Sequence, residues 1–360
     1  MDIIESTRKY EAWLEQRIPV IQEDLASKHK AMREAAFPFL RATFYRWVQL
    51  WLENCAELAS APAVLSVGDL HVGNLGTWRD SEGRLAWGVN DFDEAYPAAY
   101  TNDLVRLAAS AILASQELVL AIQPPEACQA ILDGYHKTLE NHGQPFVLAE
   151  QHEHLREWAN NQMRNPLTFW QKLLDLTPLK NIPPQMQALL EKSLPEGSLN
   201  ARIVHRVAGL GSLGRQRYTI IADWNGGKIA REAKQLLDSA WIWENPKAQS
   251  GEILYQKIID RAIRNRDPFT QQHDDWLVRR IAPDCCRIEL PELSKVRDET
   301  RLLAAMGSET ANIHLGNPSE AVGQILSDLA SRPKDWLLKG SQAMVKATLK
   351  DWEDWKKLQK

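Results

Sequence analysis

The chain has 360 residues, of which 44% are hydrophobic, and a formal net charge of −4. That length is enough for one large domain or for two lobes with a sizeable core. Charges of both signs are spread along the chain, which argues against nucleic acid or a membrane surface as a partner. No apolar run approaches the roughly 20 residues of a membrane span, and residues 1–10 lack a signal-peptide pattern. The four cysteines (55, 128, 285 and 286) lack zinc-like spacing, so we expect a cytoplasmic protein with reduced thiols.

The first half of the chain is predicted to be mainly helical. Apolar residues between Leu40 and Leu58 recur at three- and four-residue steps, which is typical of a helix with one buried face. Two short apolar runs, 63–67 and 85–89, predict strands, and a turn signal lies at 81–83. Helix is expected again from residue 103 to about Trp170, after which prolines break the pattern.

The second half begins with a β-meander. The predicted elements are a strand at 203–207, a glycine-rich loop at 209–214, a strand at 217–223, a turn at 225–227, a returning strand at 228–233, a helix from about 251 to 266, a strand at 276–281 and helices from about 291 onward. We therefore expect a helical lobe over residues 1–198, a small β lobe over 199–290, and C-terminal helices over 291–360 that pack back on the helical lobe.

Two polar motifs follow the first two predicted strands. The segment Gly68-Asp69-Leu70-His71-Val72-Gly73-Asn74 is followed sixteen residues later by Asn90-Asp91-Phe92-Asp93. Metal-assisted phosphoryl transfer needs one carboxylate beside the acceptor hydroxyl, and an amide oxygen with a second carboxylate on Mg²⁺. Asp69 fits the first role, and Asn74 with Asp91 fits the second. The alternative is that these are ordinary turn residues, but turn chemistry does not require this order and spacing.

The glycine-rich loop joins two predicted strands. Gly209, Gly211, Ser212 and Gly214 stand in a GxGSxG pattern, and a strand follows instead of the helix that a dinucleotide-binding fold requires. Such a loop between antiparallel strands can place backbone N–H groups over ATP phosphates. The alternative is a hairpin without a ligand.

A phosphate-pairing cation is expected on the next strand. Arg231 has a better position there than Lys228, although a structural ion pair of Arg231 is nearly as plausible. Glu244 or Glu252 could pair with Arg231. His71 is expected to order its loop, and Asp93 either extends the metal site or solvates the loop.

The motifs resemble those of aminoglycoside phosphotransferases and choline kinases. Residues 68–74 resemble their GDLHxGN catalytic loop, residues 89–93 their metal-binding segment, and Asn102-Asp103-Leu104 the helix that braces the catalytic loop. The resemblance implies a protein kinase-like fold, Asp69 as the base, Asn74 and Asp91 as metal ligands, and Asp103 as a structural brace.

A closer resemblance is to a large bacterial family known only as a domain of unknown function. Its pattern matches the segments 39–42, 68–74 (GDxHxxN), 90–94 (NDFDE), Asp103 with Arg106, 209–214 and 231–233, so that it covers about residues 35–315. The chain departs from these relatives at Arg231, where that family has Lys, and at Val67, where the phosphotransferases have His.

The order of the motifs differs from that in kinases, in which the glycine loop precedes the catalytic loop. We therefore expect an α+β, two-lobed, circularly permuted kinase-like fold, with Glu309 to His314 resembling the helix that precedes the catalytic loop. Gly211 and Asp91 must then lie within about one ATP length, roughly 15 Å, of each other.

Three functions fit these features. The first is an ATP- and Mg²⁺-dependent phosphotransferase with a small-molecule acceptor, and no protein partner is specified. The second is a nucleotide-binding pseudokinase, suggested by Arg231 and Val67. The third is a two-metal phosphoesterase, for which the sequence lacks an Asn-His-acid cluster.

Overall fold

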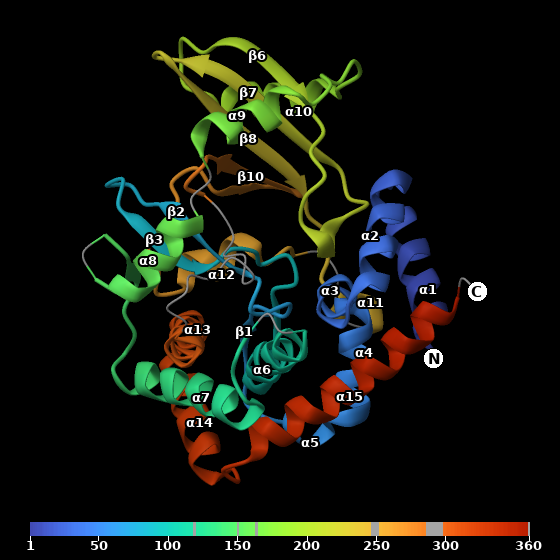
Figure 1. The fold of residues 1–360 in the computed structure, drawn as a ribbon, viewed down its shortest axis with the longest axis vertical. Helices are drawn as coiled ribbons and strands as arrows, with labels where there is room; N and C mark the ends of the chain where they lie inside the picture. Colours follow the sequence, from blue (N-terminus) through green and yellow to red (C-terminus); the bar gives the residue numbers. More distant parts are fainter. Residues whose placement is uncertain (118–119, 150, 163–164, 246–251, 286–297, 359–360) are drawn as a thin grey trace.

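The computed structural model describes residues 1–117, 120–149, 151–162, 165–245, 252–285 and 298–358. Its architecture is α+β, with a small antiparallel sheet placed above a larger helical part (Figure 1). The predicted boundary at 290–291 and the residue Cys286 lie outside the described residues. The thiols of Cys55, Cys128 and Cys285 are free.

The helices lie mostly before residue 200 and after residue 298. Their bounds are α1 Ile3–Glu15, α2 Gln22–Glu34, α3 Ala36–Ala42, α4 Phe44–Asn54, α5 Ala56–Ala59, α6 Tyr100–Gln116, α7 Pro124–Glu140, α8 Glu153–Gln162, α9 Pro166–Leu174, α10 Pro184–Lys192, α11 Ala240–Glu244, α12 Tyr255–Arg261, α13 Glu299–His314, α14 Ser319–Ser331 and α15 Trp336–Lys357, with a 3₁₀ turn at Leu210–Ser212. None of the described helices is long and apolar enough to cross a membrane.

The strands form three sheets. Their bounds are β1 Ala63–Ser66, β2 Leu75–Arg79, β3 Leu85–Val89, β4 Tyr96–Ala99, β5 Phe146–Val147, β6 Leu199–Val204, β7 Arg217–Trp224, β8 Gly227–Gln235, β9 Gln271–His273 and β10 Trp276–Ile281. The strand orders are β1-β4, β2-β3-β5 and β6-β7-β8-β10-β9. Strand β2 was not expected from the sequence, and the helix expected at 251–266 shrinks to α12, with Gly251 outside the described residues.

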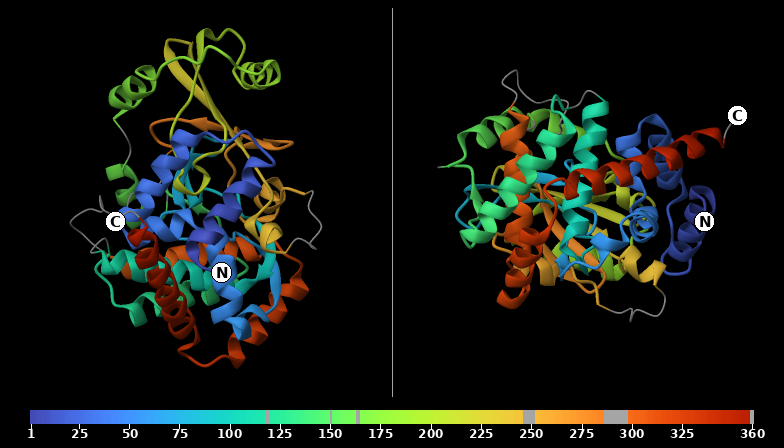
Figure 2. Two further views of the ribbon diagram at one scale, coloured as in Figure 1. Left: turned by 90° about the vertical axis from the view of Figure 1, so that its right-hand side faces the viewer. Right: turned by 90° about the horizontal axis from the view of Figure 1, so that it is seen from below.

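The five-stranded sheet holds two helices that the sequence assigned to the other lobe. Phe169 and Leu173 of α9 pack against Val204 and Ile221, whereas Met186 of α10 packs against the neighbouring residues Ile203 and Ile220. Because adjacent residues of a strand point to opposite faces, the two helices cover opposite faces of the sheet, as Figure 2 shows. By packing, α9 and α10 belong with this sheet, although both precede the boundary expected near residue 198.

The C-terminal helices pack against elements from the first half of the chain. Helix α15 runs beside α4 and α6, and the Arg46 guanidinium forms an ion pair with Asp351 at 2.6 Å. Helix α13 lies against α7, where Tyr135 Oη is 2.7 Å from His314 Nδ1. Helix α1 and the end of α15 lie on the same side of the molecule (Figure 1).

Candidate functional site

Three loops meet where the sheet approaches the helical part. We call them the Asp69 loop (residues 67–74, after β1), the Asp91 loop (90–94, after β3) and the glycine loop (209–214, between β6 and β7). They surround a cavity, here named the acidic cavity for the carboxylates that line it. Its lining includes Asp69, Asp91, Asp93 and Glu94, together with His71, Asn74, Gly209, Gly211 and Ser212.

Helix α6 fixes the Asp69 loop. The N–H groups of Val67 and Gly68 donate to the two carboxylate oxygens of Asp103 at 2.7 and 3.0 Å. One turn further on, Arg106 is completely buried and donates two hydrogen bonds to Asp69 Oδ1, one of them at 2.8 Å from Nε. Asp69 is thereby oriented by a charged partner that is itself held in place.

Burial changes the proton affinity of this pair. It raises the pKa of the Asp69 carboxyl above its usual value, and the adjacent Arg106 charge opposes the rise. Burial likewise lowers the pKa of Arg106 from its usual value, against the attraction of Asp69. A carboxylate shifted upward in this way is better suited to accept a proton than a solvated one.

Asn74 joins the Asp69 loop to the Asp91 loop. Its Nδ2 donates to the carbonyl oxygens of Asp69 and Asp91 at 3.2 and 2.9 Å, and the Asn90 N–H donates to the Asn74 carbonyl at 2.9 Å. With Nδ2 engaged, Asn74 Oδ1 is buried without a hydrogen-bond partner in the described part of the chain. A buried amide oxygen left this way is costly unless a ligand uses it.

That oxygen fits a hard cation. Mg²⁺ is commonly held by one or two protein oxygens together with phosphate oxygens and water. Asn74 and Asp91 supply such a pair. Within the described ranges, no group of three or more His, Cys, Asp and Glu side chains is arranged to hold a metal.

Lys234, at the end of β8, occupies the position that the sequence analysis gave to Arg231. Its Nζ lies 2.9 Å from both carboxylate oxygens of Asp91 and 2.6 Å from Asp93 Oδ1, and its side chain is 1% exposed. Arg231 lies three residues earlier, so it points to the other face of the strand. There its guanidinium stacks on Phe269, with Cζ 4.2 Å from the ring centre. Arg231 is not brought together with the other predicted residues.

The glycine loop lies directly over Asp69. A Cβ built on Gly211 would lie 3.2 Å from the Arg41 carbonyl and 3.6 Å from Asp69 Oδ2. Lys28 Nζ donates to the Gly211 carbonyl at 3.2 Å. A side chain at residue 211 would therefore be tight against the Arg41 carbonyl but in ordinary contact with the Asp69 carboxylate.

The remaining loop residues play different parts. Gly209 has φ = +76°, a conformation that favours glycine, and it lines the acidic cavity. The Ser212 hydroxyl donates to the Gly209 carbonyl at 3.2 Å and accepts from Arg217. Gly214 does not line the cavity: its carbonyl accepts from Ile21 N–H, which ties the loop to the segment before α2.

His71 and Asp93 support the loops from within. The Gly73 N–H donates to His71 Nδ1 at 3.1 Å, and the His71 side chain is buried. Asp93 lies between Lys234 and Arg215, with its Oδ2 3.6 Å from Arg215 Nη1. Burial raises the pKa of Asp93, and the negative charge of Asp91 adds to the rise.

Lys234 could have been found by counting the hairpin register. The turn at Asn225-Gly226 has positive φ at both residues, as a two-residue hairpin requires. From that turn, Lys234 pairs with Arg217, just after the glycine loop, whereas Arg231 pairs with Ile220 in the middle of the strand. The strand pairing therefore identifies Lys234 as the cation beside the glycine loop, which residue type alone does not.

Comparison with known families covers the first half of the molecule. A family model described as "uncharacterized protein conserved in bacteria (DUF2252)" matches residues 19–172. The match contains the Asp69 loop, the Asp91 loop, Asp103 and Arg106, and it ends before the glycine loop. No curated protein and no solved structure matches the chain at a significant level. The segment that builds the carboxylate side of the acidic cavity is therefore similar to this bacterial family.

Proposed function

We propose that this protein is an ATP- and Mg²⁺-dependent phosphotransferase with a kinase-like arrangement and a small-molecule acceptor. The observation that carries the proposal is the acidic cavity itself. The glycine loop covers Asp69, and Gly211 lines the same cavity as Asn74 and Asp91. One nucleotide could then contact the glycine loop and the candidate metal ligands together.

Each residue has a role in this proposal. The acceptor hydroxyl oxygen attacks the γ-phosphorus, its proton passes to Asp69, and the bond from the γ-phosphorus to the bridging oxygen breaks to release ADP. Arg106 holds Asp69 in position. Asn74 Oδ1 and Asp91 would hold Mg²⁺, which supplies positive charge against the phosphate oxygens. Lys234 reaches the same place from β8.

The kinase-like arrangement in permuted order is part of the proposal. Kinases place a glycine loop and a lysine on the first three strands of a sheet above the metal and base loops. In our proposal β6, β7 and β8 correspond to these strands, although they follow the Asp69 loop in the sequence. On α13, near the end of the chain, His314 Nε2 is 3.1 Å from Oδ2 of Asp103, the α6 residue that accepts hydrogen bonds from the Asp69 loop.

The alternative is a nucleotide-binding pseudokinase, which the sequence suggested because of the departures at Arg231 and Val67. Lys234 supplies an ammonium group beside Asp91, so the replacement at Arg231 no longer argues against transfer. Release or transfer of the γ-phosphate by a protein that binds ATP distinguishes the two functions.

The test is a calorimetric titration of the full chain with ATP, with and without MgCl₂. We expect Mg²⁺-dependent binding that Asp91→Ala abolishes. Asp223→Ala is the matched control, because Asp223 is an exposed carboxylate of the β lobe that pairs with Lys228. Binding that ignores Mg²⁺, or that survives Asp91→Ala unchanged, would overturn the assignment.

A further inference from the structure

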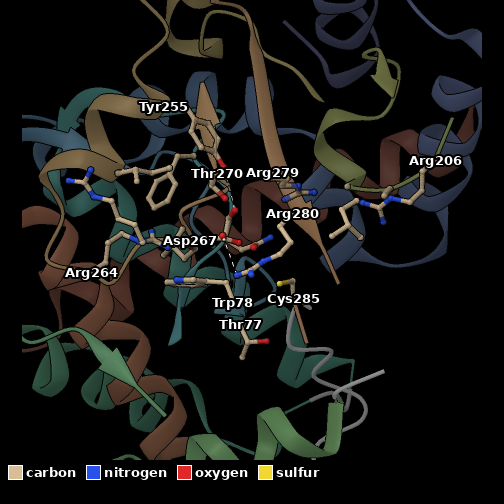
Figure 3. Close-up of a pocket in the computed structure, with 18 of the residues that line it drawn as sticks. Thr77, Trp78, Arg206, Tyr255, Arg264, Asp267, Thr270, Arg279, Arg280 and Cys285 are labelled. Atoms are coloured by element: carbon tan, nitrogen blue, oxygen red, sulfur yellow. Dashed lines mark hydrogen bonds and ion pairs between the residues drawn. The ribbon is translucent and has the colours of Figure 1, made fainter. Parts of the chain in front are cut away.

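A second cavity, of about 310 Å³, lies beneath the five-stranded sheet. Figure 3 shows side chains from several elements around it: Arg206 on one side, Arg264 on the other, and Arg279 and Arg280 of β10 between them. Arg41 and Gly209 line this cavity and also the acidic cavity, so the two spaces adjoin. The volume is in the range of small-molecule sites.

The lining is strongly basic. Asp267 is the one carboxylate among the described residues that line the cavity. Six arginines face it, and we name it the arginine cavity after them: Arg41, Arg206, Arg264, Arg266, Arg279 and Arg280. Ligand pockets are usually apolar with a few polar groups, so this excess of guanidinium groups calls for a ligand of opposite charge.

Nearby acids offset only part of this charge: Arg266 pairs with Asp260 at 2.6 Å, and Glu309 lies beside Arg264. Behind the lining, Glu232 is fully buried and accepts hydrogen bonds from Arg206, Arg217 and Arg279. One carboxylate thus faces three guanidinium groups. Burial would raise the pKa of Glu232, but the three positive charges hold it well below its usual range. Burial, together with Arg217 and Arg279, lowers the pKa of Arg206 to about 10 despite Glu232.

Two of the arginines keep donors unused in the described structure. Arg264 is fixed by stacking on Trp78 and by donating from Nη2 to the Val89 carbonyl at 2.9 Å, while its Nη1 is buried without a hydrogen-bond partner among the described residues. Arg280 donates from Nη2 to the Arg79 carbonyl at 2.7 Å and approaches Asp267 at 3.3 Å, and its Nε is similarly unpartnered in the described part. Oriented guanidinium donors with spare N–H groups suit phosphate oxygens, which accept in pairs.

We propose that the arginine cavity binds the acceptor of the phosphotransferase, and that this acceptor is a small molecule which already carries phosphate. The inference rests on the proposed function and adds the substrate class to it. Phosphate bound by Arg264, Arg279 and Arg280 would hold the acceptor next to Gly209, where the two cavities adjoin, so that its hydroxyl group can reach Asp69. The phosphates of ATP have the same chemistry, so the experiment must separate the two sources.

The probe is inorganic pyrophosphate without Mg²⁺, titrated into the full chain by calorimetry. We expect binding that is about tenfold weaker in Arg280→Gln, because a charge-assisted hydrogen bond is lost, and partly restored in Arg280→Lys. Asp267→Asn should strengthen binding, because it removes a negative charge while keeping an acceptor for the Phe269 N–H. Arg301→Gln, at an exposed arginine outside the cavity, is the control.

Pyrophosphate binding that is absent, or that all three cavity variants leave unchanged, overturns the inference. If Arg280→Gln fails to fold, its unfolding curve reveals this, and Asp267→Asn carries the test. Parallel titrations with MgATP separate the proposals. If Arg280→Gln weakens MgATP as much as pyrophosphate, the cavity holds the nucleotide's own phosphates and the acceptor assignment is overturned. If pyrophosphate binds as expected but MgATP does not bind at all, the proposed function fails while the anion site stands.

Discussion

The two adjoining cavities use charge in opposite ways. In the acidic cavity each carboxylate has a cation within reach: Arg106 for Asp69, Lys234 for Asp91, and Arg215 near Glu94. In the arginine cavity six guanidinium groups face one carboxylate within the described lining. Paired charges fix side chains in position, whereas an unmatched set attracts a ligand of the opposite sign. In our proposals, the first cavity positions reacting groups and the second binds an anion.

Glu232 is the buried carboxylate behind the arginine cavity, and its replacement is expected to have the largest effect. Glu232→Gln leaves the buried Arg217 and the partly buried Arg206 and Arg279 without their counter-charge. We expect the free energy of unfolding to fall by about 3–5 kcal/mol, as when one partner of a buried ion pair is removed. Chemical denaturation followed by circular dichroism measures this change.

The control is the exposed pair on the same sheet. Lys228 and Asp223 lie 2.7 Å apart, but their side chains are 33% and 40% exposed. Asp223→Asn should leave the free energy of unfolding nearly unchanged, because exposed ion pairs contribute little. Equal effects of the two substitutions would show that Glu232 does not neutralise the arginines.

A pH series compares two buried glutamates, one in the lining of the acidic cavity and one beside an arginine of the arginine cavity. Burial raises the pKa of Glu94, in the acidic cavity, to about 7, and that of Glu309, beside Arg264, to about 7 as well. The ordinary value is 4.5, so the folded protein binds these protons more tightly than the unfolded chain. Each group therefore favours folding below about pH 4.5, and this contribution is lost as the pH rises to about 7.

Replacing either glutamate by Gln removes one titrating group. From pH 4.5 to 8, each of these glutamates should lower the free energy of unfolding of the unmodified protein by roughly 3 kcal/mol. Glu94→Gln and Glu309→Gln should each lack this part of the decrease. Thermal or urea unfolding across this range measures the slope. If a variant keeps the full slope, its glutamate is already ionised at low pH in the folded protein.

Lys234 and Arg231 are cations on opposite faces of β8. Replacing each in turn tests which of them contributes to nucleotide binding. Lys234→Met should weaken MgATP binding by about tenfold, because the ammonium group beside Asp91 and Asp93 is lost. Arg231→Met should leave the affinity within about twofold, since Arg231 stacks on Phe269 away from the acidic cavity. The reverse result would support the position first inferred from the sequence.

The contrast between these two cations shows what the sequence could predict. Asp69 and Asp91 follow the ends of predicted strands, and Asn74 belongs to the same short motif as Asp69. The local pattern was therefore enough to suggest that the three residues lie close together. The hairpin strands were also clear, because the Asn225-Gly226 turn and alternating apolar residues fix them locally. Arg231 was preferred to Lys228 for its deeper position in the strand, whereas the register of the hairpin places Lys234 beside the glycine loop.

Other features depend on contacts between distant segments, which no local pattern encodes. Helices α9 and α10 precede the boundary expected from the sequence, and only the sheet that they cover groups them with the small lobe. The arginine cavity draws Arg41, Arg206, Arg264 and Arg280 from segments far apart in the chain. The net charge of the whole chain, −4, gives no indication of this local positive charge.

Two glycines of one loop provide the smallest and most selective comparison. Gly209 lines both cavities and has φ = +76°, whereas Gly211 lines the acidic cavity but not the arginine cavity. A Cβ on Gly211 would press on the Arg41 carbonyl at 3.2 Å and narrow the space above Asp69. We expect Gly211→Ala to weaken MgATP binding by about threefold, which corresponds to less than 1 kcal/mol, and to leave pyrophosphate binding unchanged.

Gly209→Ala should instead affect both ligands. Its backbone conformation disfavours a side chain, and a Cβ would lie 3.1 Å from Ser212 Oγ and 3.2 Å from Arg217 Nη2. Paired calorimetric titrations of the two variants with MgATP and with pyrophosphate measure the difference. If Gly211→Ala weakened both ligands equally, they would share one space, and the separation of a reacting cavity from an anion-binding cavity would have to be abandoned.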